Sequence, residues 1–156
     1  KEKYYETNLE RKQELVGQAE KLLQHNSMND AVKLAKELQA EWKKLPPRKP
    51  REAQALIRSF MFSLDLVFEK SFLNRLSLSK YPDFEQKDVK EQTQIQTSIL
   101  KDLIGRDQKE LETIKENTEK FRTHGDDFEV VLQRKINGYK RKVEVKNHIL
   151  KELLNK

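Results

Sequence analysis

Three prolines within five residues constrain the fold of this chain more than any other feature. Pro46, Pro47 and Pro50 follow a helix-type pattern that carries the only tryptophan, Trp42, and a second helix-type pattern begins at once. Proline fixes its own φ and disfavours the α region for the residue before it, so this stretch cannot continue a helix. We therefore expect a tight connection between two helices, with an aromatic residue at one corner and cations around it.

The composition favours long, exposed helices. Charged residues make up 37% of the 156 residues, and the mean hydropathy is −0.94. The chain has no cysteine, which excludes disulfides and thiol nucleophiles and is typical of a reducing, cytoplasmic compartment. No apolar run has the length of a membrane span and no signal peptide is present, so we expect no membrane partner. Because the chain begins at Lys1 and not at Met, we expect an excised fragment.

Apolar residues recur at helical spacing through most of the chain, which predicts an all-α fold. The first unit, residues 1–76, reads as three helices, the second of which can be capped by Ser27 or Asn29. Residues 77–83, with Ser79 and Pro82, read as a linker. Residues 84–156 read as a long antiparallel hairpin of coiled-coil type. At Gly105 two alternatives remain open, a helix end and a kink within one long helix.

Two of the predicted helices carry heptad seams, in which apolar positions alternate at spacings of four and three. The seam of the second helix consists of Ala31, Ala35, Leu38, Trp42 and Leu45. The seam of the last helix consists of Leu132, Ile136, Tyr139, Val143, Lys146, Leu150 and Leu153. A seam of this kind serves homodimerisation as well as an intrachain hairpin, so the oligomeric state stays open.

The net charge of +6 belongs to the last helix. Residues 134–156 hold eight cations and two anions, whereas the remaining residues are balanced. A helix of this kind can lie along the phosphate backbone of RNA, or bind the ribosome, through Arg134, Lys140, Arg141 and Lys142. The alternative, which we favour here, is a solvated helix whose lysines pair with Glu110, Glu112, Glu116 and Glu119 of the preceding helix.

The proline-rich connection is a second candidate site for anions or nucleic acid. Its cations lie beside a helix N-terminus near Pro50, whose dipole attracts anions. They are Lys43, Lys44, Arg48, Lys49 and Arg51. Trp42 could stack on a base, but its place in the heptad seam favours a core residue beside solvated cations.

The third helix has a second apolar stripe, which makes it the best candidate for a protein interface. Phe62, Leu66 and Leu73 lie apart from the residues that suffice for a core. A helix that is apolar on more than one face must be covered on each of them, either by the rest of the chain or by a partner protein.

One run of residues resembles the bacterial family called domain of unknown function 349. The resemblance rests on Leu38, Gln39, Glu41, Trp42 and Lys43, then Pro46, Pro47, Arg48 and Lys49, then Arg58, Phe60, Asp65 and Phe68. Residues 116–121 and the basic last helix resemble the C-terminal extension of family members from Bacteroidetes-type bacteria. The chain departs from the family at Leu45, where an Ile-Gly-Pro-like turn is usual, and at residues 53–56, where a second tryptophan is usual. The resemblance implies a helical fold and no activity.

Side chains suited to catalysis are scarce. His25, His124 and His148 lack metal-ligand spacing, and no phosphate-cradling glycine loop or nucleophile elbow occurs. We therefore predict no enzymatic activity, no cofactor and no metal. The first hypothesis is a helical interaction or scaffold module that binds another protein through the second stripe. The alternative is a factor that binds RNA or the ribosome through the basic connection and the last helix.

Overall fold

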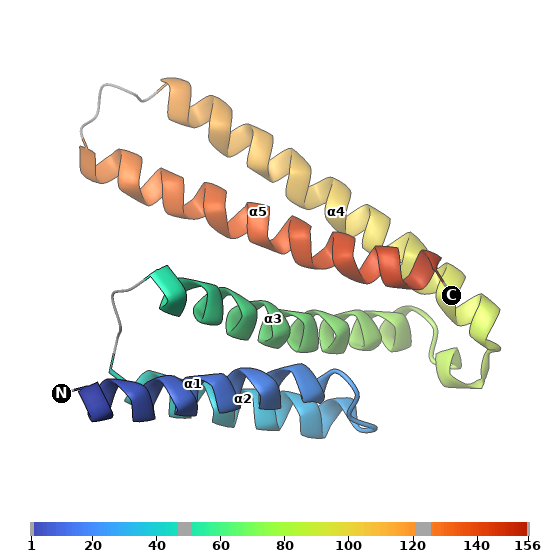
Figure 1. The fold of residues 1–156 in the computed structure, drawn as a ribbon. Coiled ribbons are helices and arrows are strands. Elements are labelled where there is room, and N and C mark those ends of the chain that lie inside the picture. Colours follow the sequence, from blue (N-terminus) through green and yellow to red (C-terminus); the bar gives the residue numbers. More distant parts are fainter. Residues whose placement is uncertain (1, 47–50, 121–125, 156) are drawn as a thin grey trace. The chain divides into compact units, whose positions relative to one another are not determined.

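The computed structural model describes residues 2–46, 51–120 and 126–155, with the side chains of 8–46, 54–120 and 127–155. These residues form five α-helices and one short 3₁₀ helix, and none of them lies in a strand, so the predicted all-α class is confirmed (Figure 1). The elements are α1 (Glu2–Leu22), α2 (Met28–Lys44), α3 (Arg51–Lys80), η1 (Phe84–Gln86), α4 (Val89–Lys120) and α5 (Asp126–Leu154). Of the helices described, none combines the length and the apolar character that crossing a membrane requires. The chain divides into two compact units, Lys1–Phe72 and Leu73–Lys156.

Helix α2 begins and ends where the sequence predicts. Ser27 is its N-cap, in an extended conformation, and its Oγ accepts a hydrogen bond from the backbone N–H of Asp30 at 3.3 Å. At the other end the N–H of Leu45 donates to the carbonyl of Trp42 at 3.1 Å. Leu45 itself is extended, as expected of a residue before proline.

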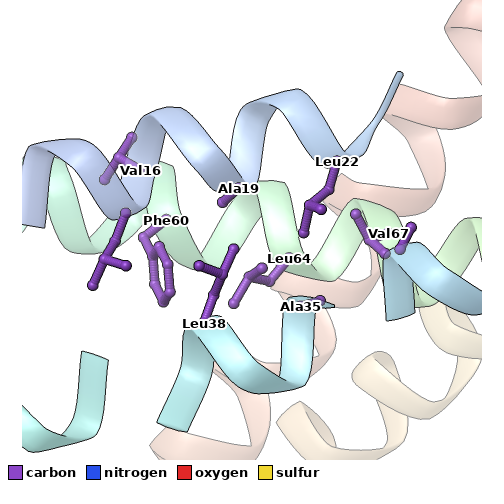
Figure 2. Packing of buried hydrophobic residues seen from close by; sticks show 10 residues of the cluster. Val16, Ala19, Leu22, Ala35, Leu38, Phe60, Leu64 and Val67 are labelled. Carbon is purple, nitrogen blue, oxygen red and sulfur yellow. The ribbon is translucent and has the colours of Figure 1, made fainter. Parts of the chain in front are cut away.

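The core of the first unit is an apolar cluster built by three helices (Figure 2). Its buried members are Leu15, Val16, Ala19 and Leu22 of α1, Ala31, Ala35 and Leu38 of α2, and Phe60, Leu64 and Val67 of α3. The α2 seam is confirmed, because its first three residues are buried in this cluster while Trp42 and Leu45 pack against it half-buried. Burial of so many aliphatic side chains is the main favourable term for a unit of this size.

Helix α3 is longer than the sequence predicts. It continues to Lys80, so residues 77–80, which read as linker, are helical. The physical reason is that Ser77, fully buried, donates from Oγ to the carbonyl of Leu73 at 2.8 Å, which satisfies the hydroxyl inside the helix. The helix then ends just before Pro82, which disfavours α geometry at Tyr81. The division into domains stays a prediction.

A compact turn leads from α3 to α4. Phe84, in η1, is 4% exposed and anchors the turn. The side-chain amide of Gln92 donates to the carbonyls of Phe84 and Lys87 at 3.0 and 3.1 Å. The carboxylate of Asp88 accepts from the N–H of Glu91 at 2.8 Å and so caps the start of α4.

Of the two alternatives at Gly105, the structure shows one continuous helix, α4, which passes through this residue. Within the second unit α4 and α5 pack along each other as an antiparallel pair (Figure 1). Of the seam predicted for the last helix, Ile136, Lys146 and Leu153 are buried and the other four members are half-buried. Val145 and Ile149 are also buried, outside the predicted seam, so the C-terminal half of α5 buries two faces and not one.

Candidate functional site

Five cations form a continuous positive segment on α5. We call Arg134, Lys135, Lys140, Arg141 and Lys142 the cationic band. All five side chains are exposed to solvent, and no acidic residue lies between positions 130 and 143. At 1.5 Å per residue the band spans about 12 Å of helix, and its side chains point to more than one side, since Lys140 is two residues from Lys142 and faces away from it. The band includes the four residues of the last helix that the sequence singled out for binding phosphate.

Most of the band lacks a carboxylate partner. Among the residues that the structure describes, Arg134, Lys135, Lys140 and Lys142 form no ion pair. The ammonium of Lys142 instead lies 4.7 Å from the ring centroid of Tyr139, a cation–π contact. The pairs expected with Glu110, Glu112, Glu116 and Glu119 are absent from this described part of the hairpin, and these glutamates are exposed. The predicted pairing with these glutamates is therefore not seen among the described residues, while the exposed side chains agree with the solvated helix face that the sequence favours.

Lys146, which lies outside the cationic band, forms an ion pair inside the hairpin. The Nζ of Lys146 lies 2.8 Å from Oδ2 of Asp107 on α4, and the two side chains are 7% and 19% exposed. Taking a lysine into the interior is costly unless a carboxylate offsets its charge. Lys146 is therefore a structural residue of the seam, and its charge does not add to the exposed band.

The basic connection is described only in part. Lys43 and Lys44 are exposed in the last turn of α2. Arg48 and Lys49 lie outside the described residues, and the side chain of Arg51 does as well. Five cations gathered around the proline turn therefore stay a prediction.

Trp42, beside this connection, is a packing residue. Its ring stacks on Phe60 of α3, with centroids 4.2 Å apart and planes inclined by 13°. The ammonium of Lys12 on α1 lies 5.4 Å from the ring of Trp42. With one aromatic neighbour and one cationic neighbour inside the unit, the indole is engaged within the fold, which agrees with its place in the heptad seam.

Sequence reasoning missed the role of Lys12. This lysine is only 3% exposed, and its Nζ donates to the carbonyl of Pro46 at 3.0 Å. It thereby ties α1 to the beginning of the proline connection. Its spacing of three and four residues before the buried Leu15 and Val16 is the signal that could have revealed it.

Next to Lys12, Arg11 forms an exposed bridge between α1 and α2. It hydrogen-bonds Glu14 at 2.9 Å and also Glu41 of α2. The hydrogen bond to Glu14, followed by the charge of Glu41, raises the pKa of Arg11 above its ordinary value. An arginine is charged at physiological pH in any case, so this contact orients α1 and α2.

The second apolar stripe of α3 is mostly buried within the chain. Leu66 and Leu73 are each 3% exposed, and Phe62 is half-buried. Side chains with so little exposed surface cannot contribute much area to a partner. Leu66 and Leu73 are therefore buried residues, and the role of the stripe as a protein interface stays a prediction.

The other candidates for a site in the described part of the chain are metal ligands and surface grooves. No three histidine, aspartate or glutamate residues gather to hold a metal within the described part of the chain. Two open grooves occur there. One, of about 300 Å³, lies between α1 and α2 over Leu22, Leu34 and Leu38. The other, of about 560 Å³, lies between the first half of α4 and the end of α5, with hydroxyls from Thr93, Thr97 and Ser98 on one side.

Comparison with known proteins finds one family model that matches the N-terminal third of the chain. The model of a family described as Domain of Unknown Function (DUF349) matches residues 1–52. The match covers α1, α2 and the proline connection, so this third of the chain is similar to the family, as the resemblance around Trp42 indicated. No curated protein and no solved structure matches the chain. The resemblance of the C-terminal part to Bacteroidetes-type members stays a prediction.

Proposed function

We propose that this chain is a non-enzymatic helical binding module whose cationic band on α5 binds the phosphate backbone of RNA. The observation that carries the proposal is the band itself, five exposed cations within nine residues and no acidic residue among them. Four of the five have no carboxylate partner in the described part of the chain, so their charge is available to an external anion. Cations of this kind bind a polyanion by releasing its condensed counterions.

The position of the band on a long helix supports this function further. Helix α5 packs along α4, and the ion pair between Lys146 and Asp107 fixes one helix against the other. The cations therefore project from a rigid support, which lowers the entropy lost when they contact phosphates. The acidic residues of α4 are interspersed with its cations, whereas the band on α5 is of one sign.

Binding another protein through Phe62, Leu66 and Leu73, our first hypothesis from the sequence, receives less support. Two of these three side chains are almost completely buried, and only Phe62 retains some surface. The expectation of no enzymatic activity rests on the lack of cysteine and on three histidines far apart in the sequence, and it is part of the proposal.

The proposal is tested by a triple charge reversal with a matched control. Arg134→Glu, Lys140→Glu and Lys142→Glu are combined in one variant, and Lys101→Glu, Lys109→Glu and Lys115→Glu of α4 in another. All six residues are exposed, and each variant lowers the net charge from +6 to zero. Fluorescence anisotropy with RNA at about 50 and 150 mM salt measures the affinity and its salt dependence. Far-UV circular dichroism checks that both variants remain helical.

We expect the α5 variant to lose at least about tenfold in affinity and the salt slope to fall by about 2 to 3, because each phosphate contact contributes about 0.7–0.9 to that slope. The α4 variant should retain most of the affinity. Equal losses in both variants would show a response to net charge alone, and no binding by the unmodified chain would refute the proposal directly.

A further inference from the structure

A glycine lies at the centre of the cationic band. Gly138 follows Arg134 by four residues and Lys135 by three, and it precedes Arg141 by three and Lys142 by four. Residues at these spacings are nearest neighbours on a helix surface. The four cations therefore surround Gly138 on α5, and Gly138 itself is exposed.

Packing within the chain does not require this glycine. A Cβ added at Gly138 meets no atom within 4 Å, and the residue lies in the interior of a regular helix. Glycine in a helix interior lowers helix stability relative to alanine. A common use of glycine is to let a ligand or another backbone approach closely, and the surface around Gly138 is open to such an approach.

The four cations form two rows with Gly138 between them. Arg134 and Arg141 are seven residues apart, as are Lys135 and Lys142, so each pair repeats after about two turns, or about 10 Å, on one side of the helix. A chain of phosphates that crosses α5 at Gly138 would have cations on both sides. The backbone at Gly138 then leaves room for the sugar-phosphate chain where a larger side chain would hold it away.

Within the band itself, from Arg134 to Lys142, the side chains favour duplex RNA over a single strand. Proteins that bind single strands stack the bases on exposed aromatic rings. The aromatic residue within the band is Tyr139, which is half-buried and has the ammonium of Lys142 over its ring. A duplex is recognised mainly through its shape and its phosphates, without base stacking, and its phosphates are held in a regular array that a rigid helix can match.

We infer that the ligand of the cationic band is duplex RNA, and that its backbone approaches α5 most closely at Gly138, between the rows Arg134/Arg141 and Lys135/Lys142. The inference rests on the proposed function and adds to it the form of the RNA and the point of contact. Recognition of this kind is independent of the RNA sequence.

A pair of glycines provides the test, because Gly105 of α4 is also helical, exposed and without an atom within 4 Å of an added Cβ. Gly138→Leu and Gly105→Leu introduce the same helix-favouring side chain at both positions. Anisotropy titrations compare a duplex RNA of about 16 base pairs with one of its own single strands at near-physiological salt. Gly138→Ala and Gly105→Ala repeat the comparison with a smaller side chain, in case a leucine variant does not fold.

We expect the unmodified chain to prefer the duplex by about tenfold or more, since the single strand offers the helix no ordered phosphate array. Gly138→Leu should weaken duplex binding about tenfold by displacing the phosphates, while Gly105→Leu leaves it within about twofold. Unchanged duplex affinity in Gly138→Leu would overturn the close approach, and equal affinity for the single strand would overturn the choice of duplex. Both results leave RNA binding through the band intact, whereas a failure of the proposed function is seen as no RNA binding by the unmodified chain.

Discussion

The two heptad seams of this chain are built from different chemistry. The α2 seam in the first unit is apolar throughout, from Ala31 to Trp42, and packs into an apolar cluster. The α5 seam in the second unit contains Lys146, buried at 6% exposure and paired with Asp107. The same four–three spacing therefore supports a seam of apolar residues in one unit and a seam that includes a buried ion pair in the other.

The difference determines how precisely each seam fixes the alignment of its helices. Apolar packing is not directional, so the first unit depends on filling space between α1, α2 and α3. A buried ion pair adds little net stability, but it penalises every register in which the charges are apart. The Lys146–Asp107 contact thus favours one alignment of α4 and α5 over others that the apolar residues alone would allow.

The largest effect on stability is expected from Trp42→Ala, which removes a residue of the apolar α2 seam. The substitution removes the stack on Phe60 and leaves a cavity beside Leu38, so the free energy of unfolding should fall by about 3 kcal/mol. Urea denaturation followed by far-UV circular dichroism measures it, since the only tryptophan is lost. Trp42→Phe keeps a stacking ring and should cost about 1 kcal/mol. Equal costs for the two variants would show that the stack does not stabilise the unit.

A smaller loss of stability is expected from Asp107→Ala, which removes the ion pair with Lys146. The variant leaves the ammonium of Lys146 buried without this carboxylate, and the free energy of unfolding should fall by about 2 kcal/mol. Asp102→Ala is the control, because Asp102 is exposed on the same helix and should change stability by less than about 0.5 kcal/mol. If Asp107→Ala were as mild as the control, the pair would have no part in holding the hairpin.

The smallest effect, a gain, is expected when a glycine inside a helix is replaced in each unit. Gly17 of α1 and Gly105 of α4 lie in regular helix, and an added Cβ meets nothing within 4 Å at either position. Gly17→Ala and Gly105→Ala should each raise the free energy of unfolding by about 0.5–1 kcal/mol, because alanine loses less conformational entropy. Thermal unfolding of both variants measures the gain. We expect it to be similar in the two units, because it depends on the helix backbone and not on whether the core is apolar or contains an ion pair. A loss of stability at Gly105 alone would show that α4 needs a bend there.

The course of α3 could be predicted only in part. Its start after the prolines follows from backbone geometry, whereas the sequence predicts its end too early because Ser77 and Ser79 resemble linker residues. Inside the folded unit Ser77 bonds to the carbonyl of Leu73, and the signal for a linker disappears. Whether a serine competes with a helix or continues it depends on burial, which a local pattern does not contain.

The candidate site, too, could be predicted from the sequence only in part. The excess of cations on the last helix is readable from the residues alone, and so is the absence of acidic residues among them. That Glu110, Glu112, Glu116 and Glu119 do not pair with these cations was decided by the packing of the hairpin, since the side chains of both groups point to solvent. The same packing selected Lys146 for burial and so separated it from the exposed band.

By itself the sequence determined the all-α class, the break at the prolines, the α2 seam and the location of the positive charge, because each depends on backbone geometry or on spacing along a helix. The tertiary structure decided which polar groups are buried, as with Lys12, Ser77 and Lys146. It also decided which apolar residues outside the predicted core stripe or seam of a helix are buried, as with Leu66 and Val145. These outcomes depend on neighbours far away in the sequence. A heptad pattern describes one face of one helix, whereas burial is a property of every element that packs against it.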